Sequence, residues 1–127
     1  TAATIHMALL GAEGLKRVAQ ACHANARKLV AALTANDCVE PIFNRPYFHE
    51  AALRIALPLD TVMRPLHAHN ILPGYELSRD YPELGDALLV CATETRNDAD
   101  IETYASHLGR IIESQTAAGC PVKPKMA

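Results

Sequence analysis

A polar cluster follows the apolar run at residues 87–91, and its members could bind a small charged ligand. Ligands of α/β proteins often meet loops at the carboxyl ends of strands, and a guanidinium can hold a carboxylate through two parallel hydrogen bonds. Arg96, with Thr93 and Glu94 beside it, is therefore a candidate substrate-binding site for a carboxylate.

The same residues also allow a purely structural interpretation. Thr95 and Asn97 could cap the helix that follows, because side-chain oxygens accept hydrogen bonds from the first free N–H groups of a helix. Glu94 and Arg96 would then form a solvated ion pair, which contributes under about 1 kcal/mol. Both interpretations stay open at the level of the sequence.

A second cluster lies beside a proline turn and combines Asn44, Arg45 and Tyr47 with Phe48 and His49. Tyrosine and arginine are enriched where protein surfaces meet, so Asn44, Arg45 and Tyr47 are candidate interface residues. The alternative is an ordinary connection between strands, with Tyr47 and Phe48 packed inward.

A complete catalytic site is hard to assemble from this sequence. There is no Gly-rich phosphate loop and no other local catalytic signature, so no catalytic residue is predicted. The lysines are Lys16, Lys28, Lys123 and Lys125. The first two fall on the polar face of a predicted helix and the last two in a loose tail, and neither setting would desolvate an amine.

Metal-ligating residue types are present but scattered. The cysteines are Cys22, Cys38, Cys91 and Cys120, and the histidines are His6, His23, His49, His67, His69 and His107. They lack the ligand spacing of known structural zinc sites, so no metal site is expected. Cys22 and Cys91 fall on apolar faces, which predicts that both are core residues.

The elements that would position the first cluster are a strand and a helix. The unbroken apolar run 87–91 predicts a central strand covered on both faces. Asn97 is then the N-cap of a helix whose first turn is acidic. The apolar residues of that helix recur at helical spacing, as Ile101, Tyr104, Leu108, Ile111 and Ile112 show.

The rest of the chain supplies further elements. Residues 1–10 predict a helix that ends at Gly11, and residues 13–33 predict a long amphipathic helix. Residues 39–43 predict a short edge strand, because Pro41 interrupts it. Alternation at residues 52–57 predicts a strand, residues 60–69 a helix with Pro65 in its first turn or at a kink, and residues 71–74 a brief strand.

This order predicts an α+β fold with a mostly antiparallel sheet of three or four strands and helices largely on one face. Residues 1–115 would form one domain, and residues 116–127 a flexible tail rich in helix breakers. The chain begins at Thr1, inside an apolar helical pattern, which suggests a fragment of a longer protein.

Composition limits the classes of function. The chain has 127 residues, half of them hydrophobic, and a formal net charge of −2. This balance gives no sign of a nucleic-acid partner or of an anionic membrane. No apolar run approaches the roughly 20 residues that span a bilayer, so a cytoplasmic protein is expected.

Three segments resemble a known family. They are Ala3-Thr-Ile-His-Met-Ala-Leu-Leu-Gly-Ala-Glu-Gly-Leu, Ile42-Phe-Asn-Arg-Pro-Tyr-Phe-His-Glu with Asn70-Ile-Leu-Pro-Gly-Tyr-Glu-Leu, and Tyr81-Pro-Glu-Leu-Gly-Asp-Ala-Leu-Leu-Val-Cys-Ala-Thr-Glu-Thr-Arg. In this order they are similar to the C-terminal part of subunit 1 of glycine dehydrogenase (decarboxylating), the P-protein of the glycine cleavage system.

The resemblance implies the small C-terminal domain of a fold-type I pyridoxal phosphate (PLP) enzyme. In that family the cofactor lysine belongs to subunit 2, so subunit 2 and the lipoyl H-protein are the implied partners. The fragment alone is expected to bind no PLP and to be inactive, with a role in subunit structure and assembly. The alternative is a free-standing α+β module that binds an amino acid or a protein partner.

Overall fold

The computed structural model of the chain describes residues 1–116. Three helices, four strands and two short 3-10 turns follow one another along this part of the chain. They are α1 (Ala2–Leu33), β1 (Val39–Pro41), β2 (Glu50–Ile55), α2 (Leu59–Ala68), β3 (Tyr75–Glu76), η1 (Leu77–Arg79), η2 (Pro82–Leu84), β4 (Ala87–Cys91) and α3 (Asp98–Gln115). Residues 117–127 of the predicted tail lie outside the described residues.

The four strands form one antiparallel sheet in the order β1-β2-β4-β3. Strand β1 lies at an edge, as Pro41 predicts. Strand β4 is central and pairs with β2 over five positions, from Glu50 opposite Cys91 to Arg54 opposite Ala87. The brief strand predicted at residues 71–74 is instead the two-residue strand β3, which begins at Tyr75.

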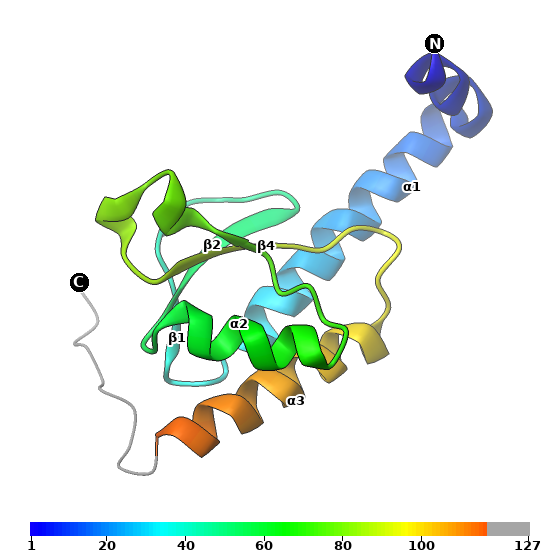
Figure 1. Ribbon diagram of the computed structural model, residues 1–127. Coiled ribbons are helices and arrows are strands. Elements are labelled where there is room, and N and C mark those ends of the chain that lie inside the picture. The colour runs from blue at the N-terminus through cyan, green and yellow to red at the C-terminus, as the bar shows by residue number, and fades with distance from the viewer. Residues whose placement is uncertain (117–127) are drawn as a thin grey trace.

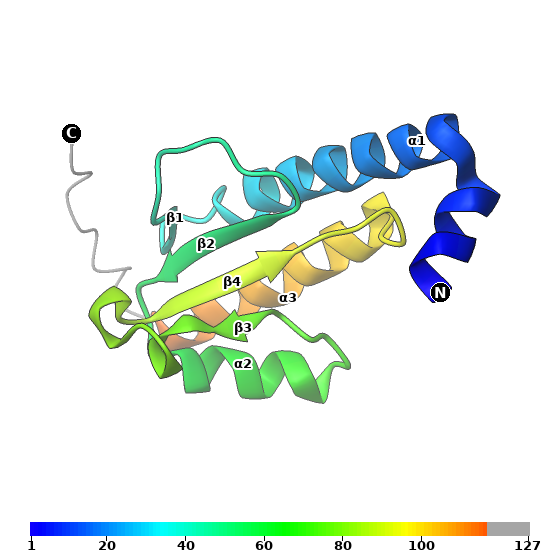
Figure 2. The same cartoon turned by 90° about the horizontal axis from the view of Figure 1, so that it is seen from above.

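Helices α2 and α3 and the C-terminal part of α1 lie on one face of the sheet (Figures 1 and 2). Leu53 of β2 and Leu88 of β4 are direct cross-strand partners on this face, and both are almost fully buried. The predicted apolar stripe of α3 is buried along its whole length. The α+β class and the placement of the helices on one face are therefore as predicted.

The prediction that both faces of β4 are covered is wrong for the described part of the chain. Successive side chains of a strand point to opposite faces, so Leu89 and Cys91 face away from Leu88 and Val90. Leu89 is only half-buried and Cys91 is exposed, so Cys91 is not a core residue. We refer to this second face of the sheet, which carries Leu89 and Cys91, as the open sheet face.

The predicted break between the first two helices occurs at Gly11. Its backbone has φ 63° and ψ −177°, a conformation that side chains with a Cβ rarely adopt. The N-terminal segment of α1, before Gly11, extends beyond the sheet (Figures 1 and 2). Among residues 1–116, no helix has the length and apolarity to cross a membrane.

Helix α2 contains Pro65 well beyond its first turn, so the predicted alternative of a helix with Pro65 in its first turn is wrong. Proline has no N–H, so it leaves the carbonyl of the residue four positions earlier, Thr61, without its usual helical donor. The side-chain amide of Gln115, from α3, donates to this Thr61 oxygen at 2.8 Å. A partner from another helix therefore compensates for the proline.

Candidate functional site

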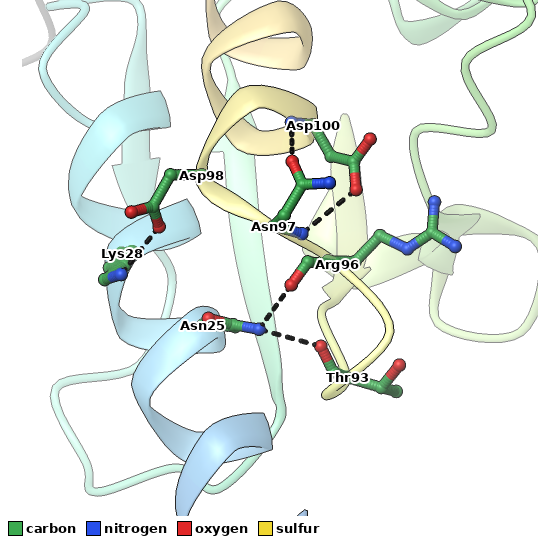
Figure 3. A network of polar contacts seen from close by, with 7 residues as sticks. All are labelled: Asn25, Lys28, Thr93, Arg96, Asn97, Asp98 and Asp100. Carbon is green, nitrogen blue, oxygen red and sulfur yellow. Dashed lines mark hydrogen bonds and ion pairs between the residues drawn. The ribbon is translucent and has the colours of Figure 1, made fainter.

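The loop that carries Thr93, Glu94 and Arg96 connects β4 to α3 and is held from the side by α1. The side-chain amide of Asn25 donates to the carbonyl oxygens of Thr93 at 3.0 Å and of Arg96 at 2.7 Å (Figure 3). These two hydrogen bonds fix the backbone at both ends of the loop. The position of the candidate residues therefore depends on a helix far away in the sequence.

The start of α3 is closed by the predicted N-cap. The Asn97 side chain accepts from the Asp100 N–H at 2.9 Å, and the Asp100 carboxylate accepts from the Asn97 N–H at 3.0 Å (Figure 3). This capping box satisfies two free donors of the helix end. Lys28 of α1 pairs with Asp98 at 2.6 Å, but both side chains are more than half exposed, so this pair adds little stability.

Glu94 does not pair with Arg96 as the structural interpretation expected. Its carboxylate accepts the thiol hydrogen bond of Cys22, with Sγ at 3.1 Å from Oε2. This hydrogen bond lowers the pKa of Glu94, and burial together with Glu94 raises the pKa of the Cys22 thiol. Glu94 is therefore an ionised side chain that joins the loop to α1.

Arg96 is left with weak contacts. Its guanidinium lies 3.4 and 3.5 Å from Thr95 Oγ1, and within residues 1–116 it forms no ion pair. Figure 3 shows the guanidinium extending away from Asn25 and Lys28. Thr95 itself contacts the Thr93 hydroxyl at 2.9 Å and caps no helix end. An exposed, unpaired guanidinium is suited to bind an anionic group.

A hollow of about 380 Å³ lies beside Arg96. Residues of the segment before β3, the end of β4 and the first turns of α3 line it, among them His69, Pro73, Asp100 and Tyr104. The buried Tyr104 hydroxyl donates to the Pro73 carbonyl oxygen at 2.9 Å, and burial raises the pKa of this phenol. Tyr104 thus fixes one wall of the hollow, a role that its position in an apolar stripe did not reveal.

The candidate interface residues form a separate group. Asn44 and Arg45 are exposed in the loop between β1 and β2, whereas Tyr47 is half-buried and packs against the core. Arg45 and Tyr47 line a second hollow of about 450 Å³ together with Phe43 and Leu89. This hollow shares no lining residue with the one beside Arg96, so the structure does not bring the two predicted clusters together.

Neither described lysine fits a covalent attachment point for PLP. Lys16 and Lys28 are exposed, and each lies within 4 Å of a carboxylate, so neither has the apolar surroundings that would desolvate an amine. Lys123 and Lys125 lie outside the described residues. The described part of the chain therefore offers no lysine suited to hold this cofactor.

Sequence reasoning missed one group of potential metal ligands. His49, Glu50 and Cys91 place one ligand atom each within 4.8 Å of one another. No spacing rule could have found them, because the pairing register of β2 and β4 brings Cys91 next to the other two. A sequence pattern alone does not reveal this register.

The fold, a four-stranded antiparallel sheet with three helices, matches one part of a larger PLP enzyme of known structure. The chain superposes on a solved structure described as glycine decarboxylase (P-protein) of the glycine cleavage system in inhibitor-bound form. The TM-score is 0.77 at 29% identity, over 84% of this chain and 24% of that chain. No protein-family model matches the chain.

Curated relatives give the same result at higher identity. The chain is 55% identical over 113 residues to probable glycine dehydrogenase (decarboxylating) subunit 1 of Methylococcus capsulatus, and 47% identical over 114 residues to that of Nitrosospira multiformis. These alignments cover 89% and 90% of this chain and 25% of each relative. The chain is therefore a homologue of part of glycine dehydrogenase (decarboxylating) subunit 1, and it spans about a quarter of the length of these relatives.

Proposed function

We propose that the chain is the C-terminal domain of the subunit of glycine decarboxylase that lacks the cofactor lysine. The complete enzyme would decarboxylate glycine with PLP held by subunit 2 and transfer the aminomethyl group to the lipoyl H-protein. The similarity to relatives named glycine dehydrogenase (decarboxylating) subunit 1 supports this proposal. By itself the domain would be inactive, since its described lysines are unsuited to hold the cofactor.

The role of the domain would be to complete the subunit and to support its assembly. We infer this role from solvent-exposed apolar surface in the described part of the chain. Ile5, Met7 and Leu9 are exposed before the Gly11 kink, with Leu9 82% accessible, and Tyr75 and Phe43 are exposed near the open sheet face. Apolar surface of this extent is typical of a site that packs against another protein surface.

Two parts of this surface would have different partners. The segment before Gly11 and the part of the open sheet face around Leu89 and Tyr75 would pack against the remaining three quarters of subunit 1. The loop with Asn44, Arg45 and Tyr47 would contact subunit 2, because its exposed arginine and half-buried tyrosine match the composition of protein interfaces. Arg96, with Thr93 and Glu94 beside it, would line the active-site cleft of the assembled enzyme.

The test uses full-length subunit 1 with and without the region that corresponds to this chain. Its association with subunit 2 is measured by pull-down, and activity by glycine–bicarbonate exchange. We expect both to be lost on deletion. Unchanged association and exchange would show that the proposal is wrong.

A point variant distinguishes a loss of association with subunit 2 from misfolding of subunit 1. Arg45→Glu reverses the charge of the loop and should weaken association with subunit 2 without changing the far-ultraviolet circular dichroism of subunit 1. Arg64→Glu is the matched control, since Arg64 is also exposed and, within residues 1–116, pairs only with Asp60 of the same helix α2. Equal effects of the two variants would contradict an interface at Arg45.

A further inference from the structure

His49, Glu50 and Cys91 meet where β2 begins and β4 ends. Glu50 and Cys91 are direct cross-strand partners, so their side chains lie on the same face of the sheet, the open sheet face. His49 immediately precedes Glu50, and the ligand atoms of the three side chains all lie within 4.8 Å of one another. His49 is half-buried, and the other two are exposed.

The backbone under this group is held by the sheet and not by a free loop. The ladder between β2 and β4 extends to the Glu50–Cys91 pair, and the Ala92 N–H donates to the His49 carbonyl oxygen at 3.2 Å. All three positions are therefore fixed relative to one another, and only side-chain rotation is left to bring the ligand atoms closer.

Aromatic contacts orient the His49 ring. The Phe48 ring packs against it edge-to-face, with ring centroids 5.1 Å apart and an interplanar angle of 86°. Phe48 is stacked in turn on His23 of α1, whose Nδ1–H donates to the Phe48 carbonyl oxygen at 3.1 Å. Helix α1 thus supports the imidazole indirectly, through Phe48.

The three side chains offer donor atoms that suit Zn²⁺. Thiolate, imidazole and carboxylate are the three donors that Zn²⁺ takes in proteins, at about 2.0–2.3 Å, and sites with three protein ligands keep a fourth position open. Around such an ion the ligand atoms would lie roughly 3.5 Å apart, so the group must contract by about 1 Å. Within residues 1–116, Glu50 has no ion-pair partner that would compete with a cation.

We propose that His49, Glu50 and Cys91 form a three-ligand site for Zn²⁺ on the open sheet face. The Cys91 thiol gives up its proton to solvent when the Zn–S bond forms, and water occupies the fourth position. This inference departs from the expectation that the chain has no metal site. It does not depend on the proposed function, because it uses only side chains of this chain.

The test is a titration of the full 127-residue chain with Co²⁺, a spectroscopic substitute for Zn²⁺. We expect a thiolate-to-cobalt charge-transfer band. The band should disappear when one equivalent of Zn²⁺ displaces the Co²⁺. Cys91→Ser should abolish the band, whereas His49→Asn and Glu50→Gln should weaken cobalt binding by about tenfold or more. Cys22→Ser is the matched control and should keep the band, because the Cys22 thiol is buried and bonded to Glu94.

Thermal unfolding provides a readout that does not depend on the absorption band. A ligand that binds only the folded state raises the melting temperature, so Zn²⁺ should stabilise the chain and its Cys22→Ser variant but not Cys91→Ser. Circular dichroism without metal shows whether each variant folds. The proposal is overturned if the chain gives no cobalt band, or if folded Cys91→Ser keeps both the band and the Zn²⁺ stabilisation.

Discussion

The side-chain amide of Asn25 lies 2.7 Å from the carbonyl oxygen of Arg96, although 71 positions separate the two residues in the sequence. The same amide also reaches the carbonyl oxygen of Thr93 (Figure 3). One side chain of α1 therefore determines where the loop with the candidate carboxylate-binding arginine lies.

The first prediction concerns this Asn25 contact. Asn25→Ala removes two hydrogen bonds and leaves two carbonyl groups without their donor, so it should lower the free energy of unfolding by about 1–2 kcal/mol. Lys28→Ala, one turn further along α1, removes only an exposed ion pair and should cost under about 1 kcal/mol. Urea denaturation of both variants checks this, and equal losses would show that Asn25 does not hold the loop.

The second prediction concerns Pro65 and Gln115. Gln115→Ala removes the donor to the Thr61 carbonyl oxygen and should cost about 1 kcal/mol. In a Pro65→Ala background the restored N–H can bond to Thr61, so the same Gln115→Ala change should cost less, by about 0.5 kcal/mol or more. A double-mutant cycle measures this coupling. Additive effects would mean that Gln115 does not compensate for the proline.

The third prediction concerns Gly74, which lies directly before β3. Its φ is +149°, and a Cβ at this position would lie 2.2 Å from the Leu89 carbonyl oxygen. Gly74→Ala should therefore destabilise the chain by about 2–3 kcal/mol and weaken the pairing of β3 with β4. Gly109→Ala on α3 meets no atom within 4 Å and should stabilise by about 0.5–1 kcal/mol. Thermal unfolding distinguishes the two signs.

The fourth prediction concerns thiol reactivity in a metal-free, chelator-treated sample. Cys91 is exposed and Cys22 is buried, so iodoacetamide should label Cys91 first. Partial desolvation by neighbouring atoms and the negative charge of Glu50 raise the pKa of the Cys91 thiol. Glu50→Gln removes that charge, which should lower the pKa, increase the thiolate fraction at pH 8 and speed labelling. Mass spectrometry follows the rate, and Glu83→Gln should leave it unchanged.

The fifth prediction concerns Arg96 in the assembled enzyme. If Arg96 binds the glycine carboxylate, Arg96→Met should raise the KM for glycine by about tenfold or more, since a charge-assisted contact is lost. The free energy of unfolding should change by less than about 0.5 kcal/mol, because the guanidinium has only long contacts to Thr95. Arg64→Met is the control and should alter neither. An unchanged KM would leave Arg96 without a role in substrate binding.

Much of the local structure could be predicted from the sequence. The Gly11 break, the apolar stripes of α1 and α3, the edge position of β1 and the Asn97 cap all follow from residues a few positions apart. Helical and strand periodicity, proline and capping side chains act over this range. The resemblance to glycine dehydrogenase (decarboxylating) subunit 1 is likewise a property of the sequence, and the comparisons confirm it.

The contacts of the candidate site were decided by the tertiary structure. One interpretation of the sequence paired Glu94 with its neighbour Arg96, but the carboxylate accepts a hydrogen bond from Cys22 on α1, and the guanidinium forms no ion pair within residues 1–116. The sequence also placed Cys91 in the core, whereas the open sheet face exposes this thiol beside His49 and Glu50. Periodicity says which side chains share a face of one element. Only the packing of α1 on the loop and the register of β2 against β4 decide which faces meet.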